Sequence, residues 1–140
     1  MTLVDTNVIS EPLRASPERR VVEWLDRQPL ETLYLSVVTI AELRFGVARL
    51  PVGKRRNDLR DRFETQVLPA FAGRILSFEL AATEAYADLM TRAQRAGLAI
   101  GLADGYIAAI AAINGMAVAT RDTLLFEAAG VAVIDPWAGG

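Results

Sequence analysis

Several acidic side chains in this chain stand apart from any basic residue at helical spacing. Glu23, Asp58 and Asp88 each precede an arginine by four residues, which is the favourable spacing for an ion pair on a helix. No basic residue occupies the third or fourth following position after a second set of carboxylates: Asp5, Glu42, Asp104 and Asp122. A carboxylate on an otherwise apolar face must stay near water, take up a proton or find a cation elsewhere in the fold.

A shared divalent cation would account for all four of these carboxylates. Mg²⁺ and Mn²⁺ take oxygen ligands, and either ion would neutralise acidic groups that otherwise repel one another. Such an ion can activate water and stabilise the charge that develops on a phosphodiester. The chain contains no His and no Cys, which excludes Cys/His zinc sites, thiolate nucleophiles, Ser-His-Asp triads and histidine acid–base catalysis. We therefore expect any catalysis to depend on carboxylates, hydroxyls and arginine.

Each of the four carboxylates also has an ordinary structural interpretation. Asp5 and Asp104 are each placed to cap a helix. Asp122 could close a turn after a strand, and Glu42 could be an exposed residue within its helix. Asp135, which precedes a proline, is interpreted as a turn residue.

An alternation of strands and helices must position these residues. Short apolar runs predict strands at residues 1–4, 33–35, 75–76, 117–119 and 131–134. Five helices are expected between and after these strands. The first is capped by Ser16 and ends before Gln28, the second spans 38–50, and the third is a charged helix over 54–67 that Pro69 stops. A long helix begins at Leu80 and ends at Gly97, and an alanine-rich helix begins at Asp104 and ends at Asn114-Gly115. This alternation favours an α/β fold with a central parallel sheet flanked by helices. Ligands of such sheets bind at the carboxyl ends of the strands, where the pattern places Asp5 and Asp122.

Composition narrows the classes of protein further. With 140 residues, 52% of them hydrophobic, the chain is predicted to form a single domain over 1–140. Fifteen Lys and Arg against seventeen Asp and Glu exclude a basic tail that coats nucleic acid. The cluster Lys54-Arg55-Arg56 is interpreted as a solvated helix face. We expect a cytoplasmic protein with no membrane partner, because no segment matches a signal peptide or a membrane span.

Four segments carry a recognisable pattern from end to end. They read Leu-Val-Asp-Thr-Asn-Val-Ile-Ser-Glu at 3–11, Ser-x-x-Thr-x-Ala-Glu-Leu at 36–43, Ala-Asp-Gly-Tyr-Ile-Ala-Ala at 103–109 and Ala-Thr-Arg-Asp at 119–122. In order and spacing, these segments resemble the PIN-domain toxins of the VapC family. The motifs at 104–106, 120–123 and 135–137 look most like the FitB branch of that family.

The resemblance implies a PIN-like domain in which the four carboxylates converge on one or two Mg²⁺ or Mn²⁺ ions. Asp5 and Asp104 would be the firmest metal ligands, Glu42 would bind metal or orient the attacking water, and Asp122 would complete the site. Thr6 and Thr120 would supply supporting hydroxyls. Arg121 would hold phosphate or stabilise the acidic cluster.

The resemblance also implies a function and a set of partners. Relatives of this kind are endoribonucleases and toxins of type II toxin-antitoxin systems, so we predict a Mg²⁺- or Mn²⁺-dependent hydrolysis of RNA phosphodiesters. The expected partners are the RNA substrate, a cognate antitoxin that inserts a basic residue near the metals, and a second copy of the chain in a homodimer or in a dimer of dimers with antitoxin. Operator DNA would be contacted only through the antitoxin.

An alternative function uses the same carboxylates differently. The chain would then be a weakly catalytic or non-catalytic FitB-like subunit that binds an antitoxin and forms a DNA-bound regulatory complex. One departure from many relatives bears on this choice, because Leu125 stands where they carry a late aspartate. Two interpretations are open: the acidic role has moved to Asp122, or the site binds its second metal weakly.

Overall fold

A parallel β-sheet forms the centre of the computed structural model, which describes residues 1–138. The last two residues of the predicted domain, 139–140, lie outside the described residues. Within the described range, five strands follow the order β3-β2-β1-β4-β5, and every neighbouring pair runs parallel. They are β1 (Thr2–Val4), β2 (Leu33–Ser36), β3 (Ile75–Leu76), β4 (Ala117–Ala119) and β5 (Val133–Ile134). The predicted α/β fold with a central parallel sheet is therefore confirmed.

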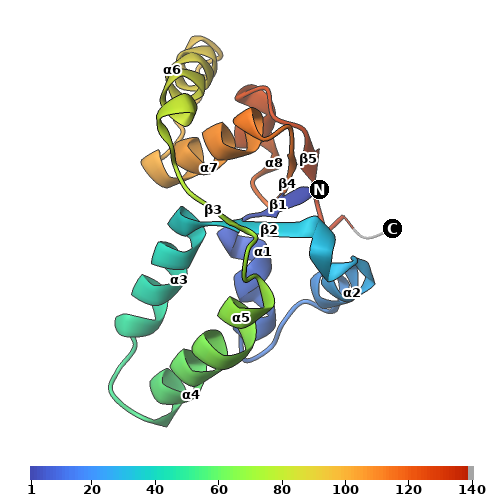
Figure 1. Cartoon of the computed structure of the whole chain (residues 1–140), viewed down its shortest axis with the longest axis vertical. Coiled ribbons are helices and arrows are strands. Elements are labelled where there is room, and N and C mark those ends of the chain that lie inside the picture. The colour runs from blue at the N-terminus through green and yellow to red at the C-terminus, as the bar shows by residue number, and fades with distance from the viewer. Residues whose placement is uncertain (139–140) are drawn as a thin grey trace.

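Helices lie on both sides of this sheet (Figure 1). Helices α6, α7 and α8 lie on one side, and α1 to α5 lie on the other. Their bounds are α1 (Thr6–Ser10), α2 (Arg19–Arg27), α3 (Val37–Ala48), α4 (Lys54–Arg62), α5 (Leu68–Ala70), α6 (Leu80–Arg95), α7 (Leu102–Ile113) and α8 (Thr123–Ala128). Two 3-10 turns, at Glu11–Leu13 and Leu30–Thr32, and a π-helical stretch at Phe63–Val67 complete the chain order.

The two faces of the sheet pack into separate hydrophobic clusters. Successive side chains of a strand point to opposite faces, so Leu3 and Val4 of the central strand enter different clusters. Leu3 packs with the side of the molecule that contains Ile107 of α7 and Phe126 of α8. Val4 packs with the side that contains Val8 of α1. Leu3 and Val4 are both fully buried, which fixes the position of the residue that follows them.

The helix predicted over 54–67 is confirmed, but its second half is π-helical and not α-helical. Helix α4 ends at Arg62, and the chain continues as a π-helical stretch in which the Leu68 N–H donates to the Phe63 carbonyl. Pro69 does not stop a helix; it lies in the first turn of the short helix α5. Proline is tolerated there because its missing N–H would have no partner within the helix.

The predicted start of helix α2 is also wrong. Its N-cap is Glu18, two residues after the predicted cap Ser16. The backbone N–H of Glu18 donates to the buried carboxylate of Glu11 at 2.9 Å, which ties the chain down just before the helix begins. This contact with a residue seven positions earlier overrides the local Ser-Pro signal.

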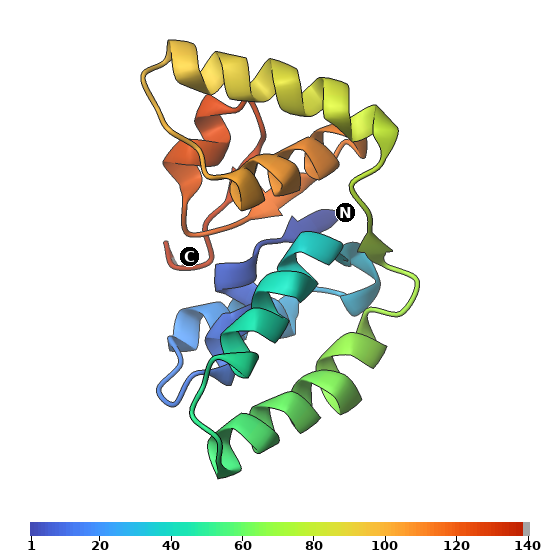
Figure 2. The same ribbon diagram turned by 90° about the vertical axis from the view of Figure 1, so that its left-hand side faces the viewer.

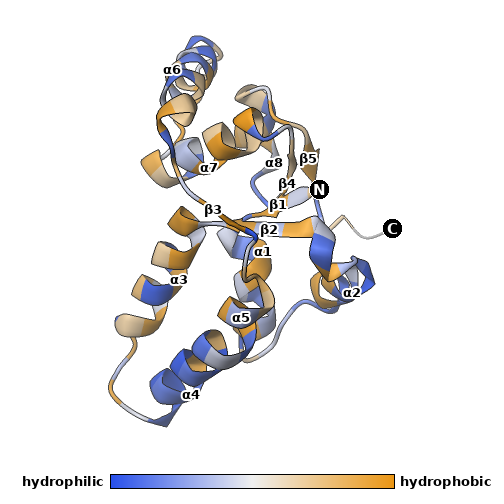
Figure 3. Cartoon of the chain, in the orientation of Figure 1, coloured by the Kyte–Doolittle hydropathy of each residue, from blue (hydrophilic) through white to orange (hydrophobic). Residues whose placement is uncertain are grey.

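Hydropathy follows the layers of the fold (Figure 3). Helix α4 is hydrophilic along most of its length, whereas α7 is largely hydrophobic and buries Ile107 to Ala111. Helix α7 ends at Asn114, and Gly115 follows with φ near +63°, as the predicted Asn-Gly stop requires. Among the described residues, no helix is both long and apolar enough to cross a membrane.

Candidate metal centre

Three aspartates meet at the carboxyl ends of the two central strands. Asp5 follows β1, and Asp122 lies shortly after β4, the parallel neighbour of β1. In the sheet, β1 lies between β2 and β4. The strands that follow β1 in sequence are added first on the β2 side and then on the β4 side, so Asp5 and Asp122 lie at the point where the strand order reverses. Asp104 comes from the first turn of α7, which faces the beginning of α1 (Figure 2). One carboxylate oxygen from each of the three lies within 4.8 Å of the others.

Asp5 is the buried member of this group, with 2% of its surface exposed. Its Oδ1 accepts a hydrogen bond from the Thr6 backbone N–H, and its Oδ2 accepts one from the Thr120 hydroxyl, each at 2.8 Å. The residue is therefore the N-cap of α1 and a member of the acidic cluster at once. The pKa of Asp5 is raised to about 6, mainly by burial and to a smaller extent by the charges of Asp104 and Glu42, while the two hydrogen bonds oppose the increase.

Asp104 is half-buried and does not open its helix as the sequence suggests. Helix α7 begins at Leu102 with Gly101 as N-cap, so Asp104 lies within the first turn. Its side chain accepts no hydrogen bond from the residues at 1–138. Burial is the largest cause of its raised pKa, followed by the charges of Asp122 and Glu42. A capping role alone does not explain these neighbouring like charges.

Glu42 approaches the cluster from α3 and is held by a chain of hydroxyls. The Thr6 hydroxyl donates to Glu42 Oε1 at 2.5 Å, and the hydroxyl oxygens of Thr6 and Thr39 lie 3.1 Å apart. Because Thr6 has one hydroxyl proton, donation to Glu42 leaves Thr6 to accept from Thr39. Thr39 is fixed in turn by Ser36, the N-cap of α3, whose Oγ accepts from the Thr39 backbone N–H at 3.0 Å. Glu42 is thus exposed to solvent, but the hydroxyl of Thr6 fixes the orientation of its carboxylate.

Asp122 is fixed by Asn7, a residue of the 3–11 motif that was not among the predicted site residues. The Asn7 amide donates to Asp122 Oδ2 at 3.1 Å, and its carbonyl oxygen accepts from the Arg121 backbone N–H at 3.2 Å. The Thr120 hydroxyl oxygen also accepts from the Asp122 backbone N–H at 3.0 Å. Asn7 could have been found from its position in the 3–11 motif, but its partners lie more than a hundred residues away.

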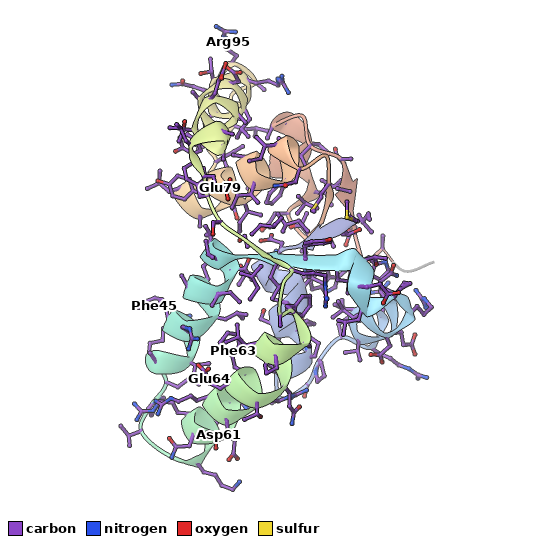
Figure 4. All side chains as sticks on the ribbon, viewed as in Figure 1. Phe45, Asp61, Phe63, Glu64, Glu79 and Arg95 are labelled. Atoms are coloured by element: carbon purple, nitrogen blue, oxygen red, sulfur yellow. The ribbon has the colours of Figure 1, made fainter. Side chains whose placement is uncertain are left out.

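None of the four carboxylates has an ion pair within the described residues. The nearest basic residue in sequence to Glu42 is Arg44, which points instead toward the π-helical stretch. Its guanidinium forms an ion pair with Glu64 and lies over the Phe63 ring at 5.1 Å from the ring centroid. Phe63 and Glu64 are labelled in Figure 4, on the side of the molecule away from the sheet.

The helical ion pairs expected for Glu23, Asp58 and Asp88 are not formed as predicted. Glu23 pairs with Arg19 and Asp58 with Lys54, each four residues earlier rather than later. Arg92, the expected partner of Asp88, donates to the Ala129 carbonyl instead. Asp135 is confirmed as a turn residue, because its Oδ1 accepts from the backbone N–H two residues later.

The arrangement of donors fits a divalent cation. Asp5, Asp104 and Asp122 present oxygen atoms close enough together to share one ion, and their mutual repulsion is not relieved by any arginine or lysine of residues 1–138. Hard cations such as Mg²⁺ and Mn²⁺ take ligands of this type. Glu42 lies outside the trio of closest oxygens, although its charge acts on both Asp5 and Asp104.

Comparison with known proteins shows the family of this chain. The PIN domain profile matches residues 2–131. The chain belongs to the PIN-domain family. Two similar relatives are the VapC ribonuclease Y4jK of Sinorhizobium fredii, 58% identical, and the toxin FitB of Neisseria gonorrhoeae, 55% identical. Each aligns over 137 residues, covering 98% of this chain and 98% and 99% of the relative, respectively.

A solved structure agrees with these sequence relatives. FitAB bound to an IR36 DNA fragment matches this PIN domain with a TM-score of 0.94 at 55% sequence identity. The match covers 98% of this chain and 96% of that chain. The predicted resemblance to the PIN-domain toxins of the VapC family, and to FitB in particular, is therefore confirmed.

Proposed function

We propose that this PIN-domain protein is a metal-dependent endoribonuclease and the toxin component of a toxin-antitoxin pair. The observation that carries the proposal is the cluster of Asp5, Asp104 and Asp122 at the carboxyl end of the sheet, without a basic partner among residues 1–138. The relatives named as a VapC ribonuclease and as the toxin FitB support the assignment of activity and class.

Each residue of the cluster would have a distinct role in the proposed reaction. Asp5, Asp104 and Asp122 would hold Mg²⁺ or Mn²⁺, and Glu42 would either complete the set or orient the attacking water. When bound, the cation supplies a Lewis acid that lowers the pKa of water and stabilises the charge on the phosphodiester. Thr6 positions Glu42 through its hydroxyl, and Asn7 positions Asp122 through its amide. Thr120 supports Asp5 and the Asp122 backbone together.

The experiment that tests the activity is cleavage of total RNA by protein free of antitoxin. Reactions contain Mg²⁺, Mn²⁺ or EDTA, and the variant Asp104→Asn is compared with Asp88→Asn, which removes the same charge from an exposed position on α6. We expect discrete products that require both a divalent cation and Asp104, with Asp88→Asn behaving like the parent protein. Equal cleavage by the parent and by folded Asp104→Asn would contradict the proposal.

The proposed partner is an antitoxin whose basic residue enters the carboxylate cluster. The relative solved as FitAB bound to DNA supports a complex of this kind. A guanidinium can compensate clustered carboxylates in place of a metal and so block the site. We propose in addition that the chain forms a homodimer, and that operator DNA is contacted through the antitoxin. An antitoxin variant that lacks this basic residue should bind without inhibiting cleavage.

A second candidate function is favoured by the same FitAB complex: a subunit that locks an antitoxin onto DNA and has little nuclease activity. Leu125 stands where, by the resemblance described above, many relatives carry a late aspartate, so the chain lacks that carboxylate. The cleavage experiment separates the two functions. Folded protein that binds Mn²⁺ and cleaves no RNA would support the subunit role.

A further inference from the structure

One face of helix α3 leads away from the carboxylate cluster and carries an exposed aromatic side chain. Phe45 lies three residues after Glu42, so the two side chains project from the same side of the helix. Although Phe45 is large and apolar, 66% of its surface is exposed (Figure 4). It belongs to neither hydrophobic cluster of the fold. Packing within residues 1–138 therefore does not explain a phenylalanine at this position.

A guanidinium lies against one face of the Phe45 ring. Arg49 Cζ lies over this ring at 5.6 Å from its centroid, and the Arg49 side chain forms no ion pair with the described residues. Because Arg49 comes four residues after Phe45, it covers the ring from the C-terminal side of the helix. The opposite face is directed toward the preceding turn of α3, which carries Glu42 and the small, exposed Ala41. The ring thus presents an open face on the side of the carboxylate cluster.

The helix surface beside this ring contains a glycine without a packing role. Gly46 lies in the interior of α3, four residues after Glu42, where glycine is less favourable than alanine. A Cβ built at Gly46 would meet nothing within 4 Å. No other element of the described chain therefore requires the absence of a side chain there. A ligand from outside the chain that approaches the helix between Glu42 and Phe45 would account for it.

We propose that this face of α3 binds an unpaired RNA base next to the scissile phosphodiester, stacked on the open face of Phe45, and that Gly46 lets the base approach the helix. The inference rests on the proposed nuclease function. Single-stranded RNA is bound largely through bases that stack on aromatic rings and on guanidinium planes. The axial rise from Glu42 to Phe45 is about 4.5 Å, which the nucleotide next to the scissile bond can span.

Two observations favour RNA over an apolar peptide as the occupant of this face. The positive charge of Arg49, which no carboxylate of the described residues neutralises, complements a polyanion that the acidic cluster would otherwise repel. The face is also continuous, through Glu42, with the carboxylates where the scissile bond must lie. Phe45 is then a substrate-binding residue, and Arg49 holds its ring by a cation–π contact.

The test measures RNA binding apart from cleavage. A single-stranded oligoribonucleotide, and the same oligoribonucleotide annealed to its complement, are titrated with the full chain carrying Asp104→Asn in Mg²⁺. On this background, Phe45→Ala should weaken binding of the single strand about tenfold, as loss of one stacked base does, and leave binding of the duplex unchanged. The slope of log K against log salt should stay the same, because the substitution removes no charge.

Further variants separate stacking from a general apolar contact. Phe45→Tyr should retain most of the affinity because a π face remains, whereas Phe45→Leu, which keeps an apolar side chain without a ring, should lose most of it. Gly46→Ala should weaken binding of the single strand several-fold while raising the melting temperature, a combination that a purely structural role does not give. The matched control is Leu30→Ala, which removes a side chain that is 46% exposed just before β2, at the opposite end of the sheet, and should leave binding unchanged.

Equal binding of the single strand by the Phe45→Ala and Leu30→Ala proteins would overturn the proposal. Full affinity in folded Phe45→Leu would also overturn it, since an apolar contact would then suffice. Unaltered binding by Gly46→Ala would overturn the close approach of the base to the helix.

The outcome can be separated from that of the proposed function. If the parent protein cleaves no RNA but Phe45→Ala weakens binding of the single strand, the nuclease proposal fails and the stacking contact stands. If the parent protein cleaves RNA and Phe45→Ala binds like Leu30→Ala, the stacking contact fails alone.

Discussion

At the scale of single residues, the position of Asp5 makes stability depend on pH. The pKa of its folded-state carboxyl is about 6, whereas its ordinary value is 3.8. Between these values the folded protein binds more protons than the unfolded chain, so the free energy of unfolding must fall as pH rises. The loss in free energy of unfolding is complete above pH 6 and amounts to about 3 kcal/mol for a pKa shift of this size. Asp104 contributes in the same direction.

The predicted result concerns protein freed of divalent ions. We expect its free energy of unfolding in urea to fall from pH 4 to pH 7 relative to that of Asp5→Asn, whose side chain does not titrate. The difference between the two proteins isolates Asp5 from the other carboxylates. Parallel pH profiles for the two proteins would show that Asp5 is not held in its protonated form by the fold.

Thr6 offers a second test at the same scale. Its hydroxyl joins Glu42 to Thr39, so Thr6→Val leaves the Glu42 carboxylate without its orienting donor. We expect kcat/KM for RNA to fall by about 10-fold or more, as for other groups that orient the ligands of a metal, while Thr6→Ser retains most of the activity. Thr91→Val, on an exposed turn of α6 where the hydroxyl donates only to the Ala87 carbonyl, serves as the control. Identical cleavage rates for the two valine variants would show that the Thr6 hydroxyl does not orient Glu42 for catalysis.

At the scale of elements, helix α7 depends on one close approach to α6. A Cβ added at Gly105 would lie 2.8 Å from Met90 Sδ and 2.9 Å from Tyr86 Cε2. Tyr86 cannot move freely, because its ring packs against Phe78 and Tyr106. The absence of a side chain at Gly105 therefore lets the first turn of α7, which carries Asp104, pack closely against α6.

Two glycine substitutions should consequently have opposite effects on stability. Gly105→Ala should destabilise the fold by about 1–3 kcal/mol through overpacking, reduced by the gain in helix propensity. Gly46→Ala in α3, where a Cβ meets nothing within 4 Å, should stabilise it by about 0.5–1 kcal/mol. Thermal unfolding of both variants checks the prediction, and a Gly105→Ala protein as stable as Gly46→Ala would show that α6 and α7 tolerate the added methyl group.

Element boundaries also show where sequence patterns are insufficient. Strands could be predicted from short apolar runs, and the sheet from their alternation with helices. The π-helical stretch at Phe63–Val67 and the late start of α2 could not. The π-helical stretch shares the helical pattern of α4 and differs in its backbone bonding, as in the bond from the Leu68 N–H to the Phe63 carbonyl. The start of α2 depends on the Glu11 carboxylate, which lies outside the helix and accepts from the Glu18 N–H. Capping rules describe local competition and do not include an acceptor from outside the capping segment, such as the Glu11 carboxylate.

At the scale of the whole molecule, the parallel sheet and the helices beside it bring Asp5, Asp104 and Asp122 into one cluster, with Glu42 next to it. The isolation of these carboxylates from basic neighbours was visible in the sequence, and the placement of Asp5 and Asp122 at strand ends followed from the alternation of elements. The hydrogen bonds of Asn7 to Asp122 and of Thr120 to Asp5 were not visible, since both span 115 residues. Only the register of β1 against β4 brings these partners together.

The same cluster predicts that a divalent cation stabilises the whole fold. Binding to the folded state alone raises the free energy of unfolding by about 2.7 kcal/mol when the ion is at one hundred times its dissociation constant. We expect Mg²⁺ to raise the melting temperature of chelated protein by several degrees at pH 7. Asp104→Asn should lose most of this increase, and Asp88→Asn should keep it. An equal increase in melting temperature in the two variants would show that the cation binds outside the carboxylate cluster.

The central claim is that one carboxylate cluster both binds the cation and hydrolyses RNA. It is tested most directly by measuring Mn²⁺ binding by calorimetry and the rate of RNA cleavage against Mn²⁺ concentration on the same antitoxin-free preparation. We predict that half-maximal cleavage occurs at the measured dissociation constant, and that folded Asp104→Asn loses both binding and cleavage. Cleavage that persists in EDTA, or that survives in Asp104→Asn after its Mn²⁺ binding is lost, would show that the cation at this cluster is not required for hydrolysis.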